Sequence, residues 1–381
     1  MANVSSLGAE PVGGRRRATR NRIYRYLYEA ETPRTKLDIS RDLAVSMPTV
    51  HQNLTELLEA GLVEHGATRK STGGRPATGL TAAANLRYAV GVALSDHRFT
   101  FMAVNLKMEE IAYHQTGNIP LAELTGSGAR LAAELAAFLA RFGLNPGKLL
   151  GVGLAVPGIL DAAGSQVLFA PTMGLRGKSV DAWIEHIPYP TFVCNDATAG
   201  GYAEWLAAGS REDMAYLSLE NGVGGAVFLN GAPYGGQNGR SAEFGHLCVV
   251  PGGRPCQCGK RGCLEAYCSA ARLSDDLGIT LEAFFAGLAA HDPAREALWQ
   301  EYLDHLATAI GNLHMILDCP LLLGGALTAY LPPYLPALRA RLAAQGGFDA
   351  DAGYLALGRY PRRAIPLGVA LHFIRDFIDG V

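Results

Sequence analysis

The chain has 381 residues, of which 49% are hydrophobic and 18% charged, and its net charge is −2. This composition is that of a globular protein of two or three domains. No apolar run reaches the roughly 18 residues that a membrane span needs. The basic N-terminus, with Arg15, Arg16 and Arg17, lacks the apolar stretch of a secretory signal. We therefore expect a cytoplasmic protein without a membrane partner, in which thiols stay reduced.

The charge is unevenly distributed along the chain. Residues 1–80 carry 12 Lys and Arg against 8 Asp and Glu, a balance of +4, which leaves 21 against 27, or −6, for the remainder. A basic head on an acidic body is a weak indication that the head binds nucleic acid. Residues 1–19 are expected to form a basic flexible tail.

Residues 20–70 have the pattern of three short helices followed by a strand. Pro33 separates the first two helices, Ser46 is a suitable N-cap for the third, and Gly61 ends it. The third helix carries an apolar stripe made of Val50, Leu54, Leu57 and Leu58. This order predicts a winged helix-turn-helix domain. The helix pattern alone also fits a three-helix bundle with a solvated face.

The third helix is expected to present side chains that suit the base edges and phosphates of a major groove in double-stranded DNA. These residues are Met47, Thr49, His51, Gln52 and Asn53. A linker or wing extension follows at residues 71–84. In it, Gly73 and Gly74 precede Arg75, and an extended Arg-Pro segment fits a narrow minor groove. A flexible linker explains the same composition.

Residues 85–381 alternate strands and helices in two similar halves. The first half contains a strand pair in RYAVGVALSDHRFTFMAVNL, a helix over residues 131–142 and a buried strand in LLGVGLAV. After TFVCND and the helical ATAGGYAEWLAA, the second half contains a strand pair in MAYLSLENGVGGAVFLNG, a helix over residues 299–317 and a strand in LLLGG. This repetition predicts an α/β fold of the actin-like ATPase or ribonuclease H-like type, with a ligand cleft between two lobes.

A cysteine cluster at residues 243–268 has the spacing of a metal site. His246 is followed by Cys256, Cys258 and Cys263, which together offer one imidazole and three thiolates. That ligand set suits tetrahedral Zn²⁺ in a closed structural site. Cys256 and Cys258 are too close in the chain to form a disulfide comfortably. The remaining cysteines are expected to be small core residues: Cys194, Cys248, Cys268 and Cys319.

Together, several stretches resemble the ROK family, named for repressors, open reading frames and kinases. They are GVGLAVPGILD, CNDATAGGYAEW, GVGGAVFLNG, AEFGHLCVVPGGRPCQCGKRGCLEAY and LLLGG. With the head, the resemblance covers residues 20 to about 375, and it makes residues 85–381 a ROK sugar-binding domain with the same four zinc ligands. It also implies a homodimer or homotetramer.

The resemblance further implies which residues hold the hydroxyl groups of a sugar. They are Asn195, Asp196, Glu243, His246 and Glu265. Carboxylates and amides suit this role, because each can bond adjacent hydroxyls. By pattern alone, Asp196 also fits a helix N-cap, and the two glutamates fit a solvated loop.

A kinase of this family needs Asp196 as general base and two glycine-rich turns for the ATP phosphates. The first turn here is residues 93–97, Ala-Leu-Ser-Asp-His, without the kinase glycines and metal-positioning aspartate. The second, residues 220–225, begins with Glu220. A carboxylate about 5 Å from a phosphate charge costs roughly 3 kcal/mol at an effective dielectric near 20. The turns therefore disfavour ATP.

We accordingly predict a non-enzymatic, sugar-responsive transcriptional regulator, a repressor of carbohydrate metabolism genes. Its partners would be operator DNA and a small sugar or amino-sugar effector. Two alternatives remain open at this point. One is an ATP-dependent sugar kinase with a DNA-binding head, and the other is a sugar-binding module whose head contacts proteins.

Overall fold

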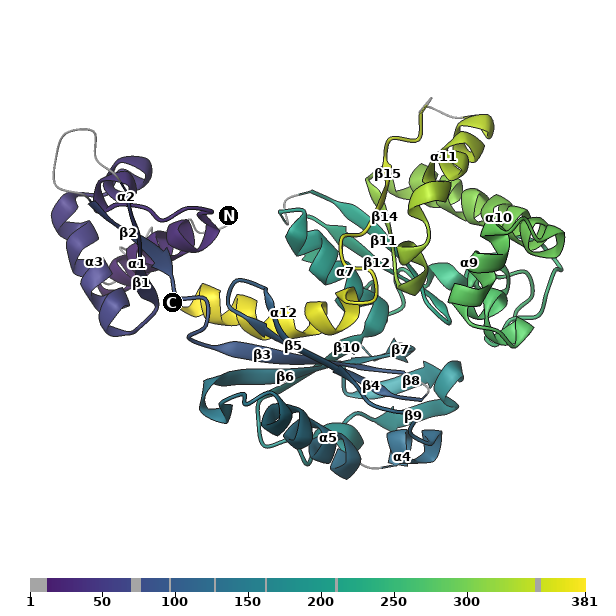
Figure 1. Ribbon diagram of the computed structural model, residues 1–381, viewed down its shortest axis with the longest axis horizontal. Coiled ribbons are helices and arrows are strands. Elements are labelled where there is room, and N and C mark those ends of the chain that lie inside the picture. Colours follow the sequence, from purple (N-terminus) through teal and green to yellow (C-terminus); the bar gives the residue numbers. More distant parts are fainter. Residues whose placement is uncertain are drawn as a thin grey trace, which may run out of the picture.

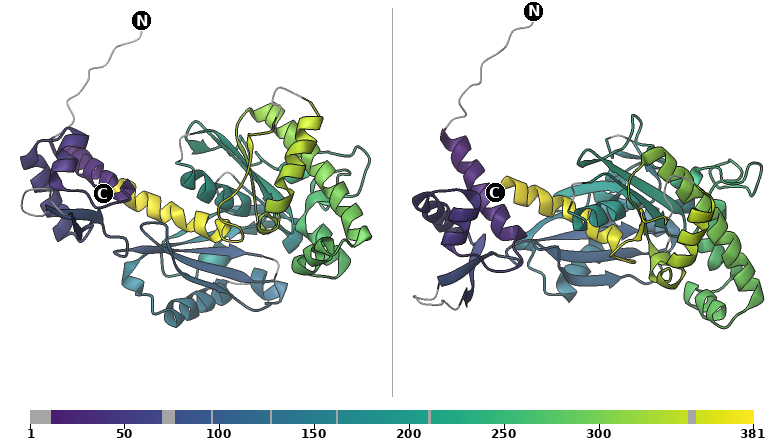
Figure 2. Two further views of the ribbon diagram at one scale, coloured as in Figure 1. Left: turned by 45° about the horizontal axis from the view of Figure 1, so that its top comes forward. Right: turned by 90° about the horizontal axis from the view of Figure 1, so that it is seen from above.

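The computed structural model describes residues 12–381 except 70–76, 96, 127, 162, 210–211 and 347–350. It has a small helical head and a two-lobed body, and the C-terminal helix reaches from one to the other (Figure 1). Figure 2 shows the same arrangement from two further sides. None of the described helices is long and apolar enough to span a bilayer.

The head is a winged helix-turn-helix, as predicted. Its elements are α1 (Val12–Glu29), α2 (Lys36–Leu43), α3 (Met47–Glu59), β1 (Val63–Arg69) and β2 (Ala77–Ala82). Strands β1 and β2 pair antiparallel to form the wing, so β2 lies within residues 71–84, which were expected to be a linker or a wing extension. Helix α1 begins well before residue 20. Residues 12–19 are therefore helical, and the expectation of a tail up to residue 19 is wrong for this part.

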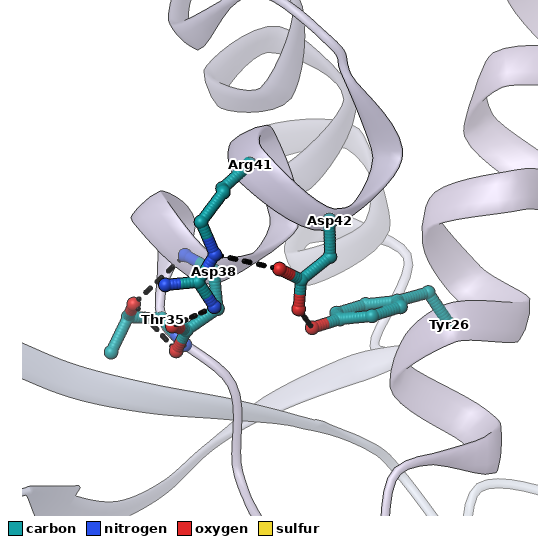
Figure 3. A network of polar contacts seen from close by, with 5 residues as sticks. All are labelled: Tyr26, Thr35, Asp38, Arg41 and Asp42. Carbon is teal, nitrogen blue, oxygen red and sulfur yellow. Dashed lines mark hydrogen bonds and ion pairs between the residues drawn. The ribbon is translucent and has the colours of Figure 1, made fainter.

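A polar network fixes α2 between its neighbours (Figure 3). The Thr35 hydroxyl accepts the Asp38 N–H (3.2 Å), and the Asp38 carboxylate accepts the Thr35 N–H (2.9 Å), which is a capping box. Tyr26 of α1 donates to Asp42 (2.6 Å), and Arg41 donates to the same carboxylate (2.8 Å). The network thus sets the position from which α3 starts.

Two five-stranded sheets form the body. The first contains β3 (Tyr88–Leu94), β4 (Phe99–Asn105), β5 (Glu110–Gln115), β6 (Leu149–Val156) and β10 (Thr191–Asn195), in the order β10-β6-β3-β4-β5. The second contains β11 (Met214–Leu219), β12 (Val223–Leu229), β13 (Ala232–Pro233), β14 (Leu321–Gly324) and β15 (Leu355–Leu357), in the order β13-β12-β11-β14-β15. Both orders follow one topology, in which the first strand pairs antiparallel on one side and parallel on the other. The predicted duplication is confirmed.

Each lobe has its own apolar core beside its sheet. The first lobe adds α4 (Leu121–Gly126), α5 (Gly128–Arg141), α6 (Asp181–Ile184) and a small sheet of β7 (Ile159–Leu160), β8 (Gln166–Ala170) and β9 (Leu175–Ser179). The second adds α8 (Glu265–Cys268), α9 (Leu281–Ala289), α10 (Pro293–Leu317) and α11 (Leu335–Ala344). The first core is built around Phe101, Phe138 and Trp183, and the second around Phe284 and Trp299.

Helices α7 (Asp196–Ala207) and α12 (Ala364–Gly380) pack against each other, and α12 also covers β3 and β6. Glycine makes this close packing possible: a Cβ atom on Gly368 would lie 1.7 Å from the carbonyl oxygen of Ala199. The buried carboxylate of Glu204 on α7 accepts the N–H groups of Arg359 (2.8 Å) and Tyr360 (2.9 Å). That pair of bonds fixes the segment from which α12 starts.

The far end of α12 is held by the head. Arg20 of α1 donates to a main-chain oxygen of Val381 (2.7 Å), Asn21 donates to the carbonyl oxygen of Ile378 (2.8 Å), and Arg25 pairs with Asp379. These donors satisfy carbonyl groups at a helix C-terminus, where cations are also favoured. Apolar residues of the head and of α12 belong to one buried cluster: Ile23, Leu27, Leu371, Ile374 and Ile378. The head is thus anchored to α12.

Candidate sugar pocket, metal centre and DNA-binding surface

A polar pocket lies where the two lobes meet at the N-terminus of α7. The first lobe contributes Pro157, Gly158, Ile159, Phe169, Pro171 and Thr172. Helix α7 and the strand before it contribute Asn195, Asp196 and Ala197, and the second lobe contributes Ser218, Glu220, Val223, Glu243, His246, Glu265 and the glycines at 222, 224 and 225. The structure therefore brings all five predicted sugar-contacting residues together in one pocket.

Asn195 and Asp196 occupy the first positions of α7. Asn195, rather than Asp196, is the N-cap: its Oδ1 accepts the Thr198 N–H (2.9 Å). Its Nδ2 donates to the carbonyl oxygen of Gly158 (3.0 Å) and to Asp196 Oδ1 (3.1 Å). This leaves the Asp196 carboxylate in the pocket. Burial raises the pKa of Asp196 to about 6, against the lowering effect of the Ala197 N–H.

A pH-dependent cost in stability follows from the raised pKa of Asp196. Between its ordinary value of 3.8 and about 6, the folded protein binds more protons than the unfolded chain, so the free energy of unfolding falls as pH rises through this window. The ionised carboxylate then costs on the order of 3 kcal/mol of folding free energy. We expect Asp196→Asn to raise the melting temperature at pH 8 but not at pH 4. Calorimetry at both pH values measures the change in melting temperature, with Glu31→Gln at an exposed position as the control. An equal change in melting temperature at pH 4 and pH 8 would contradict this prediction.

Three glutamates complete the pocket wall. Glu265 Oε2 accepts the Val223 N–H of the second glycine-rich turn (3.0 Å), and its Oε1 lies 3.8 Å from Cys256 Sγ. Glu243 Oε2 lies 3.9 Å from His246 Nε2, and burial raises the pKa of Glu243 to about 7. Glu220 Oε1 accepts the Ala326 N–H (3.0 Å). Each carboxylate is therefore held by an interaction within the second lobe.

The predicted metal ligands form a compact cluster. One ligand atom from each of His246, Cys256, Cys258 and Cys263 lies within 4.8 Å of the others. The Cys258 and Cys263 sulfur atoms are 3.7 Å apart, and Cys256 Sγ is 3.7 Å from His246 Nδ1. Two thiolates bound tetrahedrally at the usual Zn–S distance would be about 3.8 Å apart. The donor set and its spacing fit Zn²⁺, and all the cysteines are free thiols.

The other cysteines lie in different surroundings. Cys268 and Cys319 are buried, as expected, and Cys194 is half-buried on β10. The expectation that Cys248 is a core residue is wrong, because this side chain is exposed. Its backbone bridges Cys263, so it belongs to the same loop as the metal cluster without contributing a ligand atom to it.

Helix α3 presents only part of the predicted DNA-contacting set. Met47, His51 and Gln52 are exposed, and Thr49 is half-buried with its hydroxyl 2.8 Å from that of the N-cap Ser46. The prediction for Asn53 is wrong, because its side chain is only 2% exposed. Asn53 lies three residues after Val50 and four before Leu57, which places it on the apolar face. The Arg75 prediction lies outside the described residues.

Sequence reasoning did not place the Pro157-Gly158-Ile159 turn on the first-lobe side of the pocket. Gly158 has a φ of +101°, and a Cβ atom there would lie 2.5 Å from the carbonyl oxygen of Phe169. This turn brings Pro157 and Ile159 to the pocket beside Asn195. The Pro157-Gly158 pair is a turn signal, but only the fold shows that the turn faces α7.

Both the body and the head of the chain match known protein families. A model of the ROK family matches residues 89–345, and a model described as a helix-turn-helix domain matches residues 18–66. The chain is 27% identical over 313 residues to the xylose repressor of Bacillus spizizenii, covering 80% of this chain and 77% of the relative.

Two solved structures show the same fold. A ROK family transcriptional regulator, a homologue of the Escherichia coli MLC protein, superposes with a TM-score of 0.74 at 21% identity, over 96% of this chain and 97% of that one. A ROK family glucokinase of Streptomyces griseus, in complex with glucose and AMPPNP, superposes with a TM-score of 0.63 at 21% identity, over 75% of this chain and 98% of that one.

Proposed function

Because the chain belongs to the ROK family and carries a helix-turn-helix head, we propose that it is a cytoplasmic, sugar-responsive repressor that binds operator DNA. The observation that carries the proposal is the joining of a polar pocket and a DNA-binding head by two packed helices. Helix α7 starts in the pocket at Asn195 and Asp196 and packs on α12. The C-terminal end of α12 contacts α1 of the head, where Arg20 donates a hydrogen bond to Val381. The xylose repressor relative supports the same function.

The pocket has the chemistry of a sugar site. Amide and carboxylate groups of Asn195, Asp196, Glu243 and Glu265 surround a space that Phe169 and Pro171 of the first lobe also line. A sugar offers adjacent hydroxyls to the polar groups and an apolar ring face to the others. Since the two lobes contribute opposite walls, a bound sugar would favour one relative position of the lobes over others.

Three backbone N–H groups in or near the glycine-rich turns of this chain donate to groups of the protein itself. In the first turn, Ser95 N–H donates to Arg98 O (3.0 Å). In the second turn, Val223 N–H donates to Glu265. After β14, Ala326 N–H donates to Glu220. These bonds support sensing over phosphoryl transfer, and a coupled ADP-release assay with hexoses and amino sugars tests it: turnover lost in Asp196→Asn would overturn the non-enzymatic assignment.

We further propose that Zn²⁺ occupies the His246, Cys256, Cys258 and Cys263 cluster in a structural role. The metal would fix the loop that carries Glu243 and Glu265, which stand at the pocket wall. It would supply no chemistry of its own. A closed four-ligand site of this kind contributes folding energy.

The central experiment measures operator affinity with and without sugar. Fluorescence anisotropy with duplex DNA from upstream of its own coding region should give specific binding that weakens when the effector is added. Xylose, glucose and N-acetylglucosamine are suitable first probes. Two-fold symmetric operator sites would indicate that a homodimer or homotetramer binds, with the two heads in adjacent major grooves. Absence of specific DNA binding in low salt would refute the proposal.

The exposed face of α3 carries a separate prediction. Gln52→Ala should weaken specific operator binding about tenfold or more, because a good side chain–base contact contributes about 1–3 kcal/mol. The melting temperature should stay unchanged, since Gln52 is exposed. Glu59→Gln, at the other end of the same helix, is the matched control and should not weaken binding. If Gln52→Ala binds as tightly as the wild type, α3 does not read bases through this residue.

A further inference from the structure

We propose that the pocket selects an uncharged sugar over its phosphate ester, and that Glu220 is the residue that sets this selectivity. The inference rests on the proposed sugar-binding function and narrows its ligand to one chemical class. Neither the fold nor the family match decides this point, because a polar pocket between two lobes can accept either form.

The charge of the pocket lining supports this choice. Four carboxylates face the same space: Asp196, Glu220, Glu243 and Glu265. Among the described residues that line it, none is a lysine or an arginine. Sites that bind phosphate esters normally supply cationic or free backbone donors. Here an entering phosphate would meet negative charge on several sides, with no lysine or arginine among the described lining residues to balance it.

Glu220 occupies a backbone donor that a phosphate could otherwise have used. It follows β11, and its Oε1 accepts the N–H of Ala326, which opens a short 3-10 helix after the Gly324-Gly325 turn. Gly325 has a φ of +86°, and a Cβ atom there would lie 2.6 Å from the carbonyl oxygen of Leu219, so this turn is pressed against the end of β11. The Glu220 carboxylate thus takes the place that a phosphate oxygen would need, as acceptor of the Ala326 N–H after this turn.

Arg362, a basic residue that acts on Glu220 without lining the pocket, does not offset this arrangement. Arg362 lies close enough to lower the pKa of Glu220, but burial and the Asp196 charge outweigh it and raise that pKa to about 7. Arg362 itself donates to Glu282 (3.0 Å) and stands 5.5 Å over the Tyr330 ring. Its charge is therefore already committed to a carboxylate outside the pocket. At pH 8 Glu220 is mostly ionised, and discrimination against phosphate is greatest.

Glu220 is also the carboxylate that can be changed without disturbing the metal cluster. Glu243 lies 3.9 Å from His246, and Glu265 lies 3.8 Å from Cys256, so their replacement would alter ligand groups as well. Glu220→Gln keeps an oxygen that can accept the Ala326 N–H but removes the charge. Glu220→Ala removes both and frees that N–H.

The test compares three sugars with their phosphate esters at pH 8 by titration calorimetry. The probes are xylose and xylose 5-phosphate, glucose and glucose 6-phosphate, and N-acetylglucosamine and its 6-phosphate. For the wild type we expect the ester of the bound sugar to bind about a hundredfold more weakly than the sugar itself. Glu220→Gln should reduce the ratio of the ester dissociation constant to the sugar dissociation constant about tenfold, because the ester binds more tightly. The control Glu185→Gln, at an exposed position, should leave this ratio unchanged.

Two results would overturn the inference: an ester that binds the wild type as tightly as its parent sugar, or a ratio that Glu220→Gln leaves unchanged. Inorganic pyrophosphate gives an arm that needs no sugar. Pyrophosphate should raise the melting temperature of Glu220→Ala but not that of the wild type. If the melting temperature of Glu220→Ala does not rise, the role of Glu220 is refuted as well. If no sugar binds the wild type, the proposed function fails, and pyrophosphate alone then decides on Glu220.

Discussion

Cys263→Ser is expected to lose the bound metal and to unfold the second lobe at markedly lower temperature. Cys263 is 1% exposed and lies directly before Leu264, which is fully buried in the second-lobe core, and Glu265, which bonds Val223. Loss of the metal would therefore release a core residue and a pocket residue together. Because metal binding is coupled to folding, we expect the free energy of unfolding to fall by roughly 3–5 kcal/mol.

Elemental analysis and thermal unfolding measure this effect, and sugar affinity should fall in parallel. Cys248→Ser is the matched control, because Cys248 lies in the same loop but is exposed and contributes no ligand atom to the cluster. It should retain one metal ion per chain and the wild-type melting temperature. Chelation of the wild type should reproduce the Cys263→Ser result. A native protein without metal, or a Cys263→Ser variant that retains it, would refute the structural role.

Local patterns in the sequence were sufficient to predict the duplicated body. Strand pairs such as residues 88–105 and 214–229 have short connections and apolar strands, so their pairing is decided by neighbours in the chain. The metal cluster was predictable for a similar reason, since its ligands lie within 18 positions. The five sugar-contacting residues came from resemblance, and the structure shows only that they share a pocket.

Long-range contacts could not be predicted in this way. The bond from Glu220 to Ala326 joins residues 106 positions apart, and no local signal marks it. Helix α12 was not predicted: residues 366–371 of its first half are all buried, so a polar and apolar pattern marks only its second half. The prediction for Asn53 was wrong for the opposite reason. A polar residue was expected to face solvent, but helical geometry places it beside Leu57 in the head core.

Gly368→Ala is expected to damage both stability and the link between the pocket and the head. A Cβ atom at this position would lie 1.7 Å from the carbonyl oxygen of Ala199 and 3.2 Å from the N atom of Ala203, and both are backbone atoms of α7. One helix must therefore move. Overpacking of this kind costs about 1–3 kcal/mol, and more where backbone must shift. We expect a loss of about 3 kcal/mol in the free energy of unfolding.

The displaced helix should also reduce the effect of sugar on operator affinity, because α7 starts at Asn195 and Asp196 while α12 ends against Arg20 and Asn21. A ligand shifts a conformational equilibrium only through its different affinities for the two states, here the one that binds DNA and the one that does not. We expect the separation of α7 from α12 to remove the contact by which the head responds to sugar in the pocket. The matched control is Gly380→Ala on the same helix, where a Cβ atom would meet no described atom within 4 Å. It should retain the sugar response and gain up to about 1 kcal/mol of stability from helix propensity. Anisotropy titrations with and without sugar measure the response, and a folded Gly368→Ala variant with wild-type sugar dependence would show that the signal does not pass through the α7–α12 contact.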